Sequence, residues 1–208
     1  VFLAGYHVAI SSGMEYCEAD FLGVEVTGAT LGIIGMGNVG YKIALRAKAF
    51  EMNILYHNRT WRKEQEEQAV GAIYCEKVDN LLQQADFVTV VVSLTPQTHK
   101  LIGEREMELM KPTATLITSA IQVPSRTVDS LGLVTALQTG VTRAAALDVT
   151  CLEPLPRVRM LLKLKNVIVT PHLGIKTDKA TYMITEEAAE NILAALNGLP
   201  IPSEVFPS

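Results

Sequence analysis

Cysteine is scarce in this chain of 208 residues, and its three cysteines lie far apart, at Cys17, Cys75 and Cys151. An odd number of widely spaced cysteines argues against a disulfide framework and gives no ligand pattern for zinc, so we expect no bound metal. A reduced, intracellular compartment fits this composition best, and we expect the protein to be cytoplasmic.

The chain also lacks an excess of positive charge and any long hydrophobic run. Its 18 basic and 22 acidic residues give a net charge of -4, which argues against a nucleic-acid partner or an anionic membrane surface. No apolar stretch is long enough to span a bilayer. Residues 1–10 are apolar but have neither a basic flank nor a convincing cleavage site, which favours a helix fragment over a signal peptide.

A glycine motif between a predicted strand and a predicted helix is the most informative feature present. Residues 29–34 form an apolar run that is too short for a helix and is typical of a buried strand. Gly35, Gly37 and Gly40 then give G-x-G-x-x-G, and residues 41–50 follow with helical spacing. A second short strand comes next, so the motif has the strand–turn–helix setting of a nucleotide-binding unit.

Each glycine has a physical task in such a motif. The first permits a tight turn, the second lets backbone amides approach a pyrophosphate, and the third lets the helix pack closely on the strand. The helix start then offers backbone N–H groups and the positive end of the helix dipole to the phosphates, and Asn38 and Val39, within the motif, are further candidate cofactor contacts. The pattern predicts a dinucleotide-binding site; a glycine-rich turn that serves packing alone is the alternative.

Strand and helix patterns alternate along the rest of the chain. Short apolar runs predict seven strands, at residues 29–34, 53–56, 72–74, 87–92, 115–118, 144–149 and 167–170. Helical spacing predicts helices at residues 41–50, 62–70, 78–84, 104–110, 129–138 and 178–196. This order predicts an α/β fold, a doubly wound parallel sheet of the Rossmann type. We expect an entry segment at residues 1–23, the nucleotide-binding domain at 24–178, and a C-terminal helix and tail at 179–208.

The residues after the second predicted strand bear on which dinucleotide is bound. A carboxylate at this place takes the ribose hydroxyls of NAD and repels a 2′-phosphate. Here Asn58 follows Gly35 by 23 residues (58 − 35), with Arg59, Thr60 and Arg62 beside it. The missing carboxylate and the two guanidinium groups favour NADP(H), with NAD(H) as the alternative cofactor. A solvated loop in which Thr60 caps the next helix is the other interpretation.

Three residues late in the chain are candidates for acid–base chemistry. Asp148 ends a predicted strand, Glu153 lies in the loop after it, and His172 stands at the carboxyl end of the last strand. In an open α/β sheet ligands bind at that edge. A histidine beside a glutamate is a suitable general acid, because the carboxylate raises its pKa.

Several motifs in order resemble the cofactor domain of the D-isomer-specific 2-hydroxyacid dehydrogenases, over about residues 23–205. They include VTGATLGIIGMGNVG, SLTPQT, AALDVT, EPLP, LKNVIVTPHLG and NGLPIPSEV. The glyoxylate reductase/hydroxypyruvate reductase branch is the most similar. The resemblance implies NAD(P)H-dependent reduction of a small 2-keto acid, such as glyoxylate or hydroxypyruvate, to the 2-hydroxy acid, in a homodimer that forms through the cofactor domain.

Site roles follow from the same resemblance. It implies that His172 protonates the carbonyl oxygen of the substrate, that Glu153 holds and charges this histidine, and that Asp148 lies by the nicotinamide carboxamide. It also implies cofactor contacts from Ser93, Pro96 and Thr98 on the adenosine side of the cleft, and from Gly174.

The sequence departs from the family where an arginine should grip the substrate carboxylate. Aligned without a gap from the preceding strand, Ile121 takes the place of that arginine; aligned on the dipeptide SR, Arg126 takes it after an insertion. The family's PHxGS also becomes PHLGIKT, with Ile175 at the usual polar position. Isoleucine offers no donor, so poor turnover is expected if Arg126 cannot reach the cleft.

The substrate-binding lobe that precedes the cofactor domain in the family is largely missing from this sequence. In the family the active site is a cleft between two lobes, and a single lobe leaves it open to water. We therefore also consider a catalytically inactive dinucleotide-binding protein that acts as a sensor or partner subunit.

Overall fold

The computed structural model describes residues 23–59, 61–62, 64–118, 127–149 and 160–204. Contacts divide the chain into two compact units, Val1–Pro171 and His172–Ser208. No helix in these described ranges is both long and apolar enough to cross a bilayer. Predictions for Thr60, Ile121, Arg126, Glu153 and two cysteines lie outside the described residues.

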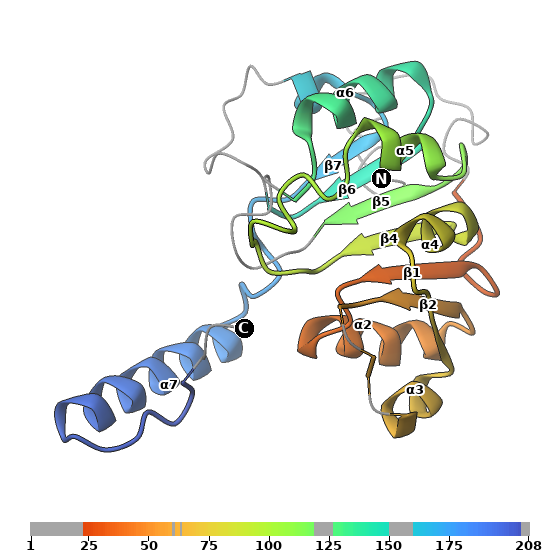
Figure 1. Ribbon diagram of the computed structural model, residues 1–208. Helices are drawn as coiled ribbons and strands as arrows, with labels where there is room; N and C mark the ends of the chain where they lie inside the picture. Colours follow the sequence, from red (N-terminus) through yellow and green to blue (C-terminus); the bar gives the residue numbers. More distant parts are fainter. Residues whose placement is uncertain (1–22, 60, 63, 119–126, 150–159, 205–208) are drawn as a thin grey trace. The chain divides into compact units, whose positions relative to one another are not determined.

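The first unit is built on one sheet of seven strands that lie parallel in the order β3-β2-β1-β4-β5-β6-β7 (Figure 1). The strands are β1 (Thr30–Ile34), β2 (Asn53–His57), β3 (Ala72–Tyr74), β4 (Phe87–Val90), β5 (Thr115–Thr118), β6 (Ala144–Leu147) and β7 (Val167–Val169). The predicted doubly wound sheet of the Rossmann type is confirmed. β4 and β6 each end two residues before the predicted boundary, because the chain leaves the sheet for the loops at its carboxyl edge.

The helices of this unit cover both faces of the sheet (Figure 1). They are α2 (Asn38–Ala49), α3 (Glu64–Val70), α4 (Val78–Gln84), α5 (Glu104–Leu109) and α6 (Ser130–Thr139), with a 3₁₀ helix, η3 (Met160–Lys163), before β7. α2 begins at Asn38, three residues before the predicted start, because the glycine turn itself supplies its N-cap, Gly37. No periodicity in the sequence indicates η3, since four residues are too few to show one.

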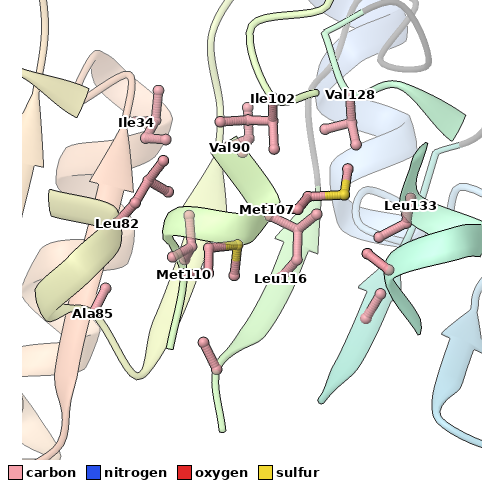
Figure 2. Packing of buried hydrophobic residues seen from close by; sticks show 14 of the residues in the cluster. Ile34, Leu82, Ala85, Val90, Ile102, Met107, Met110, Leu116, Val128 and Leu133 are labelled. Atoms are coloured by element: carbon pink, nitrogen blue, oxygen red, sulfur yellow. The ribbon is translucent and has the colours of Figure 1, made fainter. Parts of the chain in front are cut away.

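The larger core lies between the sheet and helices α4, α5 and α6. Figure 2 shows part of it, with Met107 and Met110 near Leu116 of β5. The two leucines predicted to point inward from α4, Leu81 and Leu82, are fully buried. Burial of these apolar side chains is the main source of stability for this layer of the fold.

The opposite face is covered by α2, through Ala44 and Ala47. Phe50, the last residue of the predicted helix, is 60% exposed, because the helix ends at Ala49 and Phe50 is its C-cap. An apolar cavity of about 400 Å³ lies beside the amino ends of β1 and β4 on this face. Its lining includes Val26, Leu31, Ile43, Phe50, Phe87 and Ile117.

The second unit contains one long helix, α7 (Asp178–Leu196), at the predicted place. The hydroxyl of Thr177 caps it by accepting a hydrogen bond from the N–H of Ala180 at 3.2 Å. Within the described residues none of the 19 residues of α7 is buried, although isoleucines recur along it.

Candidate dinucleotide-binding site

The glycine turn lies where the strand order of the sheet reverses. β1 pairs with β2 on one side and with β4 on the other, so successive strands are added in opposite directions from this point. The N–H of Gly35 donates to His57 O at 3.0 Å, and the N–H of Val91 donates to Ile34 O at 2.9 Å. Crevices at such switch points, beyond the carboxyl ends of the strands, are the usual ligand sites of this architecture.

Gly35 and Gly40 are required by close packing. Gly35 has φ +99°, and a Cβ there would lie 2.7 Å from Val92 Cγ1 and 2.8 Å from the backbone of Val91. A Cβ on Gly40 would lie 2.5 Å from Gly35 O. Any other residue at either place would displace backbone, so these two glycines hold α2 tightly against β1.

Gly37 differs from the other two glycines of the motif, because a Cβ built on it would meet no heavy atom of the described residues within 4 Å. It is the N-cap of α2, and no side chain among the described residues caps the helix there. Asn38 and Val39, the first two residues of the helix, are exposed. The start of α2 therefore presents backbone N–H groups at an open surface, which fits a pyrophosphate.

Asn58 holds the glycine turn with its side-chain amide. Its Oδ1 accepts from Met36 N at 2.6 Å, and its Nδ2 donates to Met36 O at 3.3 Å. Tyr74 Oη in turn donates to Asn58 O at 3.1 Å. An amide can pair with both backbone groups of Met36, whereas a carboxylate can only accept. The sequence pattern did not indicate this role.

Two arginines follow Asn58. Arg59 is exposed. Arg62 lies beside the first turn of α2, with its Cζ 5.2 Å from the ring centroid of Tyr41 and its Nε 3.0 Å from Glu66 Oε2. Nε has no hydrogen-bond partner among the described residues, so the contact with Glu66 is an ion pair in which the N–H points elsewhere.

A buried tyrosine fixes the backbone at this corner. Tyr56 Oη donates to a carboxylate oxygen of Glu67 and accepts from Arg62 N at 3.1 Å. Burial, and then the hydrogen bond to Glu67, raise the pKa of Tyr56 to about 12. The sequence predicted Tyr56 only as part of an apolar strand. The signal for a further contact was its hydroxyl, because the hydroxyl of a buried ring needs a hydrogen-bond partner.

The loop after β4 lies at the same edge, next to the end of β1. Thr98 Oγ1 donates to Ser93 O at 2.7 Å and accepts from Thr95 N at 2.7 Å, which closes the loop on itself. Ser93 is exposed and Thr98 is half-buried, and Pro96 lies between them in the same loop. The predicted adenosine-side residues therefore sit in a structured turn beside the glycine motif.

Asp148 lies at the carboxyl end of β6, on the other half of this edge. Its N–H donates to Thr118 O at 3.1 Å, and its carboxylate accepts from the hydroxyl of Thr170. His172 and Gly174 belong to the second unit, where His172 is half-buried with φ +53°. The structure thus gathers the glycine turn, Asn58, the Ser93–Thr98 loop and Asp148 along one edge of the first unit.

A family model covers most of the chain, including this edge. The model described as "D-isomer specific 2-hydroxyacid dehydrogenase, NAD binding domain" matches residues 4–174. The chain belongs to this family. The glycine turn and the strand edge described above lie within the matched part.

Curated relatives agree with the family model. Glyoxylate/hydroxypyruvate reductase B of Enterobacter sp. (strain 638) is 44% identical over 180 residues, which are 86% of this chain and 54% of the relative. Glyoxylate reductase of Thermococcus gammatolerans is 43% identical over 193 residues, or 93% of this chain and 56% of the relative. The chain therefore spans about half the length of the curated relatives it matches.

Solved structures of the family have the same fold. The TT0316 protein from Thermus thermophilus matches with a TM-score of 0.86 at 35% identity, covering 98% of this chain and 62% of that one. D-lactate dehydrogenase from Aquifex aeolicus, solved with NAD and lactic acid, matches with a TM-score of 0.83 at 28% identity, covering 95% and 62%.

Proposed function

We propose that this chain binds NADP(H) at the glycine turn and that the protein reduces a small 2-keto acid, of the glyoxylate or hydroxypyruvate type, to the 2-hydroxy acid. The observation that carries the proposal is the contrast within the motif: Gly35 and Gly40 are packed tight, while no described residue covers Gly37 or caps the start of α2 with its side chain. This arrangement suits a pyrophosphate. The names of the relatives supply the substrate class.

The preference for NADP(H) over NAD(H) is supported by charge at the end of β2. The carboxylate that NAD-binding sites place there is replaced by Asn58, whose amide is engaged with Met36. The guanidinium of Arg62 lies beside the first turn of α2. A 2′-phosphate would thus meet the cation of Arg62, with an amide in place of a carboxylate at the Asn58 position itself.

Roles in the reaction follow the family. The cofactor, when bound, supplies the hydride. His172 donates a proton to the keto oxygen, Glu153 keeps that histidine charged, and Asp148 contacts the nicotinamide end of the site. Arg126 binds the substrate carboxylate, as the alignment on the SR dipeptide implies. Ser93, Pro96, Thr98 and Gly174 complete the cofactor contacts, with Arg59 and Thr60 near the ribose.

One assay separates this proposal from a second candidate, a dinucleotide-binding sensor or partner subunit without turnover. NADPH is titrated by its fluorescence, and its oxidation is then followed with glyoxylate or hydroxypyruvate. Binding with oxidation supports the reductase, and binding without oxidation supports the second candidate for this chain. Failure to bind either NADPH or NADH contradicts both. His172→Ala is the matched control, because it should abolish oxidation and leave NADPH affinity nearly unchanged.

We also infer a homodimer. On the face of the sheet that α2 covers, Phe87, Ile117 and Ile168 remain only partly buried among the described residues, and a second chain would remove this apolar surface from water. Sedimentation equilibrium should give a mass of about twice 22.6 kDa, and a monomer at micromolar concentration contradicts the inference. A cytoplasmic location, to be checked by fractionation, and a domain boundary near residue 178 remain proposals.

A further inference from the structure

An ion pair lies beside the part of the site that would meet the 2′-phosphate. Arg62 precedes α3 and Glu66 lies within it, four residues later, with Nε and Oε2 3.0 Å apart. Both side chains are partly shielded from water, at 20% and 35% exposure. Screening is weaker there than at an open surface, so the carboxylate offsets much of the charge on Arg62.

Arg62 does not depend on Glu66 for its place. Its guanidinium lies over the ring of Tyr41, and its backbone N–H is held by Tyr56 Oη at 3.1 Å. Tyr56 is fixed in turn by Glu67. Removing the charge of Glu66 should therefore leave the guanidinium beside α2, held by the cation–π contact and the backbone hydrogen bond.

The contact between Glu66 and Arg62 is one of charge, with no hydrogen bond at the buried Nε of Arg62 in the described part of the chain. The Nε–H has no acceptor among the described residues even though Oε2 is 3.0 Å away. Guanidinium groups bind phosphate through two parallel N–H donors. An incoming phosphate is attracted by the guanidinium of Arg62 but meets the opposing charge of Glu66, whereas a neutral ribose hydroxyl does not.

We propose that Glu66 is a specificity-determining residue that restrains the preference for 2′-phosphorylated dinucleotides by sharing the charge of Arg62. The inference rests on the proposed NADP(H) site. It assigns opposite effects to two neighbours: Arg62 strengthens binding of the 2′-phosphate, and Glu66 weakens it. Neither residue affects a dinucleotide that has only a 2′-hydroxyl.

The test is a double-mutant cycle with Glu66→Gln, Arg62→Gln and the double variant. Affinities for NADPH and NADH are read from the fluorescence of Trp61, the single tryptophan, next to Arg62. Glu66→Gln should tighten NADPH about two- to fivefold, the range of a partly exposed ion pair, and leave NADH unchanged. Arg62→Gln should weaken NADPH by about tenfold or more, and Glu66→Gln should then have no further effect.

Glu64→Gln is the matched control, because it removes the same charge from the same helix turn while its partner is Gln68. It should change neither affinity. Equal tightening by Glu64→Gln and Glu66→Gln, or no change of the NADPH/NADH ratio in Glu66→Gln while Arg62→Gln lowers it, would overturn the role of Glu66 alone. An unchanged ratio in Arg62→Gln would overturn the 2′-phosphate site itself.

Discussion

The two units of this chain are stabilised in different ways. In the first, both faces of the sheet carry buried clusters, and residues such as Leu81, Leu82 and Ile33 are fully buried. In the second, α7 has 19 residues and none is buried within the described part of the chain. The dinucleotide side is therefore folded by its own buried contacts. Within the second unit, α7 is instead supported by helix propensity, capping and exposed hydrogen bonds from Ser203 to Asn191 and Glu187.

The comparison is tested most strongly by matched truncations. Leu82→Ala should lower the free energy of unfolding by about 2–5 kcal/mol, because it leaves a cavity in a closed core. Ile192→Ala, in α7 at 60% exposure, should change it by less than about 0.5 kcal/mol. Urea denaturation of both variants measures the two changes in the free energy of unfolding. A similar loss for both would show that α7 has a buried face.

Alanine substitutions at glycine positions test the tight packing of the glycine turn. Gly35→Ala should cost up to about 3 kcal/mol, from the left-handed backbone and the contact with Val91. Gly28→Ala is the control, since Gly28 also has positive φ, at +74°, but a Cβ there meets nothing within 4 Å in the described part of the chain. Its cost should be about 1 kcal/mol. Equal melting temperatures for the two variants would contradict the packing argument.

Tyr56 allows a test at alkaline pH. Its folded pKa of about 12 exceeds the ordinary value of 10.0, so its contribution to stability is complete below pH 10 and is lost as the pH rises toward 12. Tyr56→Phe should cost about 1–2 kcal/mol at pH 7, because Glu67 and the Arg62 N–H lose a partner. It should also flatten the fall in stability above pH 10. An identical alkaline profile in the variant would refute the assignment.

The smallest effect is expected in the second unit. Thr177→Ala removes the N-cap of α7 and should cost the helix about 1 kcal/mol. Circular dichroism should show reduced helicity, with the melting of the first unit unchanged. Thr185→Ala, within α7, should instead preserve or raise helicity, since alanine is the better helix former.

The sequence was sufficient for the fold and for the glycine turn, because both rest on local patterns. Hydrophobic runs located all seven strands, and the motif spacing located the start of α2 to within three residues. Contacts between segments far apart in the chain could not be predicted from the sequence. The pairing of Asn58 with Met36 spans 22 positions, and that of Tyr56 with Glu67 joins a strand to a helix. Such contacts depend on the order of the strands in the sheet, and the local periodicity of hydrophobic residues carries no information about that order.

The side chains that bear on catalysis were harder to place for a different reason. His172 was predicted from its position after the last strand, and it belongs to the second unit. Arg126 and Glu153 lie outside the described residues, so their roles remain predictions. The site is therefore best defined at the glycine turn, where local backbone geometry fixes the position of every residue.

Titration of NADPH against Gly37→Val, with the unmodified chain beside it, tests the central claim most directly. Gly37 has an extended backbone with negative φ, −79°, and a Cβ on it would meet no heavy atom of the described residues within 4 Å. The variant should keep its melting temperature to within about 2 °C and lose NADPH affinity by at least about tenfold, because the side chain occupies the path of the pyrophosphate. Unchanged affinity in a folded Gly37→Val variant would contradict a dinucleotide site at this turn.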